Sequence, residues 1–275
     1  MSQSHSLSAG ARQTLLTLVT VICLAPLVFM VATSLRNPAE YALNPSGLPH
    51  SFTVANYAQA LFDLPTMRWA MNSLIVSVIS VAVSTTIAAL ASYAVVFGRF
   101  RGRSVLVSSS IGFIMVPPVV LLLPMFVVMV NVKLVNTLAS VVIFYSCLMV
   151  PFAVFFMVNF FRTIPTELIE AAVVDGAGPV RCLWSVVLPL SRAALVTIAI
   201  VNVIWAWNEL LIALVFLQNE GQRTLMAGMT LLQGRYSTNQ PLVLAVATLS
   251  ILPVAAFYFA SQRAFVRGLT AGIGK

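Results

Sequence analysis

The chain has 275 residues, of which 60% are hydrophobic and only 8% are charged. A soluble domain carries charge on roughly a quarter of its residues, so this composition excludes an ordinary soluble protein and indicates a membrane protein surrounded by lipid. The net charge of +8 comes from basic residues scattered at the ends of apolar runs; this argues against nucleic-acid binding and fits the cytoplasmic excess of Lys and Arg in membrane proteins.

Six apolar runs are long enough to cross about 30 Å of hydrocarbon as helices. They cover Thr14–Leu35, Trp69–Phe97, Ser104–Val130, Leu138–Phe161, Ala193–Leu217 and Pro241–Ser261. We therefore expect an all-α membrane protein with six transmembrane helices, built as a single transmembrane domain over residues 14–261 between tails at 1–13 and 262–275. The first run is too long for the apolar core of a signal peptide, so we interpret it as an uncleaved helix.

Prolines interrupt the third apolar run at Pro117, Pro118 and Pro124. Because proline lacks a backbone N–H and clashes with the preceding turn, we expect this span to be kinked or broken there. Only the fifth run contains a charged residue, Glu209.

The distribution of basic residues predicts the orientation of the chain. Six spans place both tails on one side, and the segments on that side hold ten Lys and Arg residues, including the cluster Arg99–Arg103. The other side holds five, Arg36, Arg68, Lys133, Arg223 and Arg235. The excess predicts that both termini are cytoplasmic.

The segment 162–192, between the fourth and fifth spans, is predicted to be a helix–turn–helix on the cytoplasmic side. Pro165 and Thr166 suit a helix start, and Glu167 lies where the positive end of the helix favours an acid. Gly176 and Gly178 mark a turn and Pro179 can begin a second short helix, while Pro189 interrupts before the fifth span. Small side chains here would let another protein approach the backbone closely.

The same segment carries a specific resemblance. Glu170-Ala171-Ala172, then Gly176, then Val186-x-Leu188-Pro189 resembles the EAA signature of ABC importer permeases, with Val186 in place of the usual isoleucine. Asp175-Gly176-Ala177 resembles the DGA variant of sugar permeases. The resemblance implies a type I importer permease fold in which this segment is a coupling helix that docks on a cytoplasmic ATPase. The implied contact residues are Glu170, Ala171, Ala172, Asp175, Gly176, Ala177, Leu188 and Pro189.

The resemblance extends over nearly the whole chain and is nearest to the smaller permease subunit of maltose-type importers. The end, Gly268-Leu269-Thr270-Ala271-Gly272, is similar to a tail that reaches the ATPase dimer. Residues 224–229 resemble an external loop that can enter the binding protein, which makes Gly228 a candidate contact with that protein. Arg235 and Tyr236, in the same external segment, could likewise reach a docked binding protein. Phe52-Thr53 and Asn56-Tyr57 are similar to the first external segment.

The fifth span contains a cluster of polar and aromatic residues, Asn202, Trp205, Trp207, Asn208 and Glu209. Sugars present apolar ring faces and many hydroxyls, so these side chains are candidates for the substrate path. The spacing predicts that Asn202, Trp205 and Glu209 share one helical face. The alternative is that Glu209 pairs with a neighbouring subunit while the tryptophans only pack.

No enzyme chemistry is visible in the sequence. The histidines are His5 and His50, there is no P-loop, and Cys23, Cys147 and Cys182 form no metal-binding or disulfide pattern. We therefore expect no cofactor on this chain, with ATP and Mg on a partner ATPase.

The resemblance implies an inner-membrane importer in a bacterium or archaeon, in which this chain forms half of the path for a sugar or oligosaccharide. The partners it implies are a second permease, two copies of an ATPase, an extracytoplasmic solute-binding protein or lipoprotein, and membrane lipid. Amino sugars or glycerol-phosphate derivatives are alternative solutes. The alternative functions are a stand-alone secondary transporter and a membrane assembly subunit. The coupling segment argues against both, because it has a purpose only where an ATPase binds beneath it.

Overall fold

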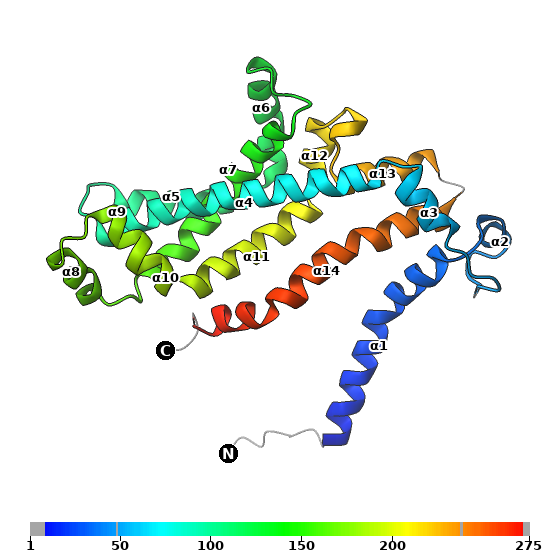
Figure 1. The fold of residues 1–275 in the computed structure, drawn as a ribbon, viewed down its shortest axis with the longest axis horizontal. Helices are drawn as coiled ribbons and strands as arrows, with labels where there is room; N and C mark the ends of the chain where they lie inside the picture. Colours follow the sequence, from blue (N-terminus) through cyan, green and yellow to red (C-terminus); the bar gives the residue numbers. More distant parts are fainter. Residues whose placement is uncertain (1–8, 48, 237–238, 272–275) are drawn as a thin grey trace. The chain divides into compact units, whose positions relative to one another are not determined.

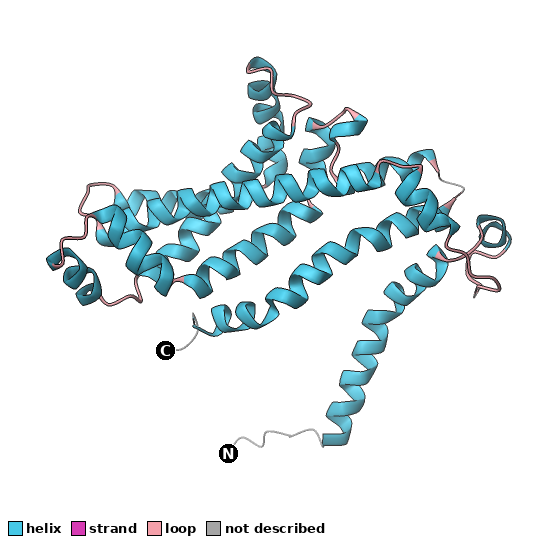
Figure 2. Ribbon diagram, viewed as in Figure 1, coloured by secondary structure: helices cyan, strands magenta, loops and turns pink. Residues whose placement is uncertain are grey.

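The computed structural model describes residues 9–47, 49–236 and 239–271, and in these ranges it contains helices and loops but no strand (Figure 2). The chain divides into two compact units. The first contains the residues up to Thr66 together with Met229–Ile251, and the second contains Met67–Gly228 together with the residues from Leu252 onward.

The long helices account for the predicted spans (Figure 1). Four of them contain an uninterrupted apolar span, namely α1 (Ala9–Ser34), α4 (Thr66–Phe97), α7 (Leu138–Phe161) and α14 (Gln240–Ala271). Two further apolar stretches are helix pairs bent at a short break: α5 (Arg103–Ile114) with α6 (Pro118–Asn131) at 103°, and Pro179–Leu190 with α11 (Arg192–Asn208) at 78°, where α11 covers most of the predicted fifth span. With each bent pair as one span, the expected six-span all-α fold is confirmed.

The remaining helices are short. They are α2 (Pro38–Leu43), α3 (Ala55–Phe62), α8 (Thr166–Val174), α9 (Pro179–Cys182), α10 (Leu188–Leu190), α12 (Leu211–Phe216) and α13 (Leu225–Arg235), with a π-helical turn η1 (Leu183–Val187) and a 3₁₀ turn η2 (Glu220–Gln222).

The third span breaks at the proline pair, as predicted. Pro117 has an extended backbone, with φ −61° and ψ 131°, because the ring of Pro118 disfavours helical geometry at the residue before it. Pro118 then occupies the start of α6, where its missing N–H would have no intrahelical partner in any case. Pro124, in contrast, lies inside α6 without ending it.

Helices α4 and α7 pack along a seam of small residues. Ser80 Oγ donates to the carbonyl of Val142 and Ser92 Oγ donates to that of Val154, each at 3.3 Å. Both pairs are 62 residues apart, so α4 and α7 run in the same direction. The chain between them must therefore cross back, which makes the broken pair α5–α6 one span. Serine suits this seam because it permits close helix packing and hydrogen bonds across it.

The second unit has two distinct ends. At one end, the rings of Phe97 and Phe161, which close α4 and α7, are 6.5 Å apart. The loop with Arg99–Arg103 and the segment 162–191 both start here, and Leu183 belongs to the same apolar cluster as Phe161. The basic loop and the predicted coupling segment are therefore on one side of the span bundle.

At the opposite end of this unit, the turn after α6 docks on the end of α12. The Asn136 N–H donates to the carbonyl of Phe216 at 3.0 Å, and its Oδ1 accepts from the N–H of Gln218 at 2.7 Å. Asn136 has a φ of 65°, a left-handed conformation that asparagine tolerates better than most residues.

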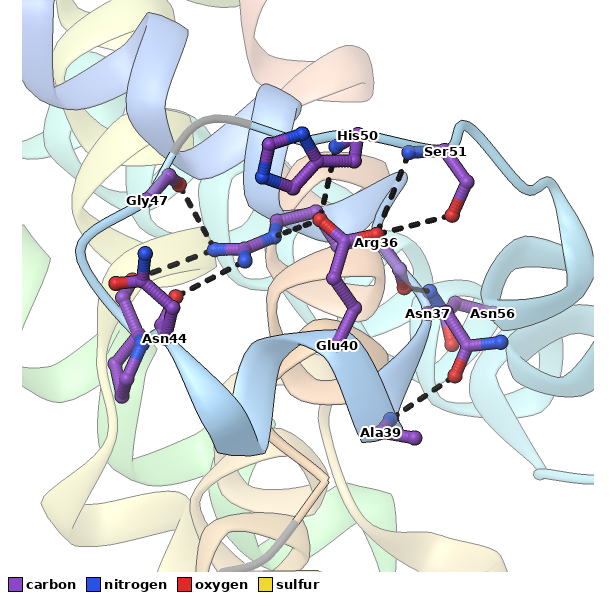
Figure 3. Close-up of polar contacts among 10 residues, drawn as sticks. Arg36, Asn37, Ala39, Glu40, Asn44, Gly47, His50, Ser51 and Asn56 are labelled. Atoms are coloured by element: carbon purple, nitrogen blue, oxygen red, sulfur yellow. Dashed lines mark hydrogen bonds and ion pairs between the residues drawn. The ribbon is translucent and has the colours of Figure 1, made fainter.

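In the first unit, the segment after α1 folds around a buried arginine (Figure 3). Arg36 is 1% exposed, and its guanidinium donates to the carbonyls of Asn44 and Gly47 at 2.9 Å each and to Glu40 Oε1 at 3.3 Å. Asn56 Nδ2 donates to the Arg36 carbonyl at 2.8 Å. The sequence predicted Arg36 only as an external charge, and its burial was missed.

The carboxylate of Glu40 closes this arginine-centred fold. It accepts from the His50 N–H at 2.9 Å, and from the N–H and Oγ of Ser51 at 3.3 and 2.9 Å. The bond from His50, then those from Ser51 and the charge of Arg36, hold the pKa of Glu40 below its ordinary value of 4.5, against the opposing effect of desolvation. The folded segment therefore favours the ionised carboxylate.

We predict that acid loosens this segment. A depressed carboxyl pKa contributes stability that is present above the ordinary value and is lost as the pH falls through the lowered one. Amide exchange at His50 and Ser51, corrected for its intrinsic pH dependence, should accelerate in that window. Glu40→Gln should exchange faster at neutral pH and lose the additional acid response. An unchanged acid response in this variant would contradict the role of Glu40.

Candidate functional site

Helix α8 ends in a glycine cap that accounts for the spacing of the EAA motif. The Ala177 N–H donates to the carbonyl of Ala172 at 2.9 Å, and the Gly176 N–H donates to that of Val173 at 3.0 Å. These two bonds form a Schellman motif, which needs a left-handed residue after the helix, and Gly176 has a φ of 80°. The backbone of this turn therefore favours glycine.

The surface of α8 is open to a partner. None of its residues is buried, and Val174 is 87% exposed. A Cβ atom added at Gly176 or Gly178 would meet nothing within 4 Å. Glu170, Ala171 and Asp175 are also exposed, while Ala172 and Ala177 are half-buried. The predicted helix–turn–helix is present, beginning after Pro165 and again at Pro179.

The second half of the motif packs inside the chain. Leu188 packs against the apolar cluster that contains Val187 and Phe161, while Pro189 is exposed. Ser191 is fully buried, and its N–H donates to the carbonyl of Val187 at 3.0 Å where the chain bends into α11. Leu188 thus serves the attachment of this segment to the span bundle.

An apolar pocket of about 240 Å³ lies between α7 and α11. Its lining residues are Leu148, Met149, Phe152, Val201, Asn202 and Trp205. Asn202 is 4% exposed, and its Nδ2 has no hydrogen-bond partner. An unpaired buried amide is costly, so it marks a place where a polar ligand or water would be favoured. Two of the predicted path residues are therefore brought together here.

Glu209 lies just past the end of α11, where its carboxylate bonds Tyr145, the residue that also contacts Trp205, as the predicted shared face requires. Helix α11 ends at Asn208, and Glu209 has an extended backbone with φ −70° and ψ 127°. Its carboxylate also accepts from the N–H of Ile212 at 3.0 Å and from that of Ala213 at 3.2 Å. Glu209 is therefore a side-chain cap on α12. Trp207 is buried and Asn208 is exposed, and neither lines the pocket.

Tyr145 of α7 is a residue that sequence analysis missed. It is fully buried, its hydroxyl donates to Glu209 Oε2 at 2.7 Å, and its ring meets Trp205 edge to face at 5.2 Å. Glu209 thus has a partner within its own chain. One tyrosine among the apolar residues of a span gives no sequence signal, because its partner is 64 residues away.

Gly228 also differs from its prediction as an external loop residue. It lies in the first turn of α13, directly under the indole of Trp69, and the neighbouring Leu225 is 1% exposed. The indole Nε1 donates to the carbonyl of Glu220 at 2.8 Å, and Asn72 Nδ2 donates to those of Gly221 and Arg223. Residues 218–228 are therefore bound to the start of α4.

The other predicted contacts lie at the ends of α13 and α14. Arg235 is exposed and Tyr236 is half-buried. The backbone of Gly268, Leu269, Thr270 and Ala271 continues α14, and Gly272 lies outside the described residues. Within the described ranges, no group of three or more His, Cys, Asp or Glu side chains could hold a metal ion.

Comparison with known proteins identifies the family of this helical chain. A profile of the binding-protein-dependent transport system inner membrane components matches residues 84–271. The chain belongs to this family. It is therefore a permease subunit of a binding-protein-dependent importer in the inner membrane, and not an enzyme. This membership favours the importer subunit over the stand-alone transporter.

Individual relatives match over almost the full chain. The sulfoquinovosyl glycerol transport system permease protein SmoH of Agrobacterium fabrum is 35% identical, over 90% of this chain and 88% of its own. The trehalose/maltose transport system permease protein MalG of Thermococcus litoralis is 30% identical, over 93% and 92%. A solved bacterial ABC transporter involved in the import of the acidic polysaccharide alginate has a chain that matches with a TM-score of 0.79 and 25% identity, covering 96% of this chain and 99% of that one.

We predict that Gly228→Ala destabilises the protein although alanine is the better helix former. The added Cβ would overlap the indole of Trp69, which is 1% exposed and hydrogen bonded. Overpacking of this kind costs about 1–3 kcal/mol, which should lower the midpoint of thermal unfolding in detergent. Gly234→Ala, in the same helix but with open space around its Cβ, is the matched control. Equal midpoints for the two variants would contradict the packing described here.

Proposed function

We propose that this chain forms half of the translocation path of an ATP-driven importer for a sugar or oligosaccharide. A second homologous permease forms the other half, two ATPase subunits bind ATP and Mg, and an extracytoplasmic binding protein delivers the solute. The observation that carries the proposal is α8, an exposed and rigidly capped helix at the end of the span bundle that also holds Arg99–Arg103. A transporter that worked alone would need no such helix.

In this proposal α8 is the coupling helix. Glu170, Asp175 and the open glycines form its outward face, where Val174 offers an apolar contact. Leu188 and the buried Ser191 attach the segment to the bundle, so a displacement of α8 is transmitted to α11. Closure of the ATPase would then move the spans as rigid bodies between states open to either side. The end of α14, at Gly268–Ala271, is a second candidate contact with the ATPase.

The orientation belongs to the same proposal. The end with Arg99–Arg103 and α8 is cytoplasmic, and the end with Trp69, Asn136 and residues 218–225 is external. Six spans then place both termini inside, in agreement with the excess of basic residues there. Arg235 and Tyr236 are candidate contacts with the binding protein on the external side.

The pocket of Asn202 and Trp205 is the candidate substrate path. The indole of Trp205 can stack on the apolar face of a sugar ring, while the unpaired amide of Asn202 can bond a sugar hydroxyl. The similar proteins named above belong to transport systems for sulfoquinovosyl glycerol, for trehalose/maltose and for alginate, which supports a carbohydrate as the solute.

The experiment that tests the proposal is purification of the tagged chain from its native membrane in mild detergent, followed by mass spectrometry. We expect an ABC ATPase and a second permease to accompany it. The binding protein of the same system can then be screened for stabilisation by mono- and oligosaccharides. A stable chain that purifies without any ATPase would overturn the proposal, and stabilisation only by non-carbohydrate solutes would overturn the solute class.

We further predict that Gly176→Trp abolishes recovery of the ATPase while membrane insertion stays normal, because bulk on the outward face of α8 blocks its docking. The control for backbone strain is Gly102→Trp. Gly102 also has a positive φ, of 97°, and open space around it, and it lies at the same end of the bundle. Gly176→Asn should retain ATPase binding because asparagine tolerates the left-handed conformation. Equal ATPase recovery for the two tryptophan variants would contradict the placement of the contact.

A further inference from the structure

We propose that Tyr145 is a positioning residue that fixes the break between α11 and α12 to α7, and thereby sets the geometry of the pocket lined by Asn202 and Trp205. A single side chain of α7 contacts both the last turn of α11 and the residue at the break. Its ring meets Trp205, which precedes the break, and its hydroxyl donates to Glu209 at the break itself. The inference concerns the same site as the proposed function and rests on that function for its transport readout.

The bond between Tyr145 and Glu209 belongs to the stronger class of hydrogen bonds. Its acceptor is a carboxylate, its length is 2.7 Å, and the tyrosine is fully buried. A carboxylate within a membrane segment is costly unless it is well paired. Here the N–H groups of Ile212 and Ala213 bond the same group, so the phenol completes a set of three donor groups.

Packing at this position needs the ring of Tyr145 but not its hydroxyl. The adjacent Phe144 fills the same apolar cluster with a plain ring and contacts Phe216 at 5.5 Å. A phenylalanine at position 145 could likewise pack against Trp205. The oxygen of Tyr145 therefore has one identifiable task, which is to hold Glu209.

Helix α12 is consequently held at both of its ends. Its far end is bound through the N–H of Asn136 to the carbonyl of Phe216, and its near end through Glu209 to Tyr145. Without the near attachment, α11 and α12 could change their mutual angle independently of α7. The pocket lies between α7 and the last turns of α11, so its shape would no longer be fixed during the rigid-body motions of transport.

The test compares Tyr145→Phe with wild type in the reconstituted complex. We expect the maximal uptake rate to fall about tenfold, as for loss of a hydrogen bond to a charged group, with the KM within about twofold and assembly unchanged. Amides of Ile212 and Ala213 should exchange hydrogen faster. Tyr258→Phe, which removes a phenol oxygen from the 43% exposed Tyr258 of α14, is the matched control and should leave both readouts unchanged.

A double variant separates the attachment from general destabilisation. Glu209→Ala removes the acceptor, so adding Tyr145→Phe to it should cause no further loss of uptake. Independent losses that multiply, or native uptake and native exchange in Tyr145→Phe, would overturn the inference. So would a loss of assembly equal to the loss of uptake. If the wild-type complex imports no saccharide, the proposed function fails, while exchange at Ile212 and Ala213 still decides whether Tyr145 fixes the break.

Discussion

Each break in a membrane-spanning helix leaves backbone N–H and C=O groups that lipid cannot satisfy. Two of the breaks in the second unit satisfy these groups by opposite means. Between α5 and α6 the adjacent prolines Pro117 and Pro118 have no N–H to leave unpaired. Between α11 and α12 the N–H groups of Ile212 and Ala213 are present, and the carboxylate of Glu209 supplies their acceptor. Each break thus has its unpaired N–H groups removed or satisfied by the residues next to it.

Helix α7 links the consequences of the two breaks. Its parallel seam with α4, through Ser80 and Ser92, requires the broken pair α5–α6 to return the chain across the membrane. The same helix carries Tyr145 to the break after α11. It also ends at Phe161, where the cluster that anchors η1 and Leu188 begins. One continuous element therefore connects the segment at 162–191 with the pocket.

The sequence predicted what depends on local pattern. Six spans follow from apolar length, the break at Pro117 from the chemistry of proline, and the start of α8 after Pro165 from the rules of helix initiation. Contacts between distant positions could not be predicted in this way. The burial of Arg36, the indole of Trp69 over Gly228 and the partner of Glu209 each depend on residues separated in sequence. The end of α11 at Asn208, which lets the Glu209 carboxylate cap α12, could not be predicted from an apolar run that continues through it.

The EAA signature can be divided by physical role once the geometry of α8 is known. Gly176 is fixed by its positive φ, and Ala172 contributes its carbonyl to the cap, so the interval between them is set by the Schellman motif. Leu188 is fixed by packing against the bundle. Glu170 and Ala171 of the signature, and Asp175 beside Gly176, are exposed. A motif that looks like one surface therefore contains residues that the fold of the segment itself requires and others that the fold leaves exposed.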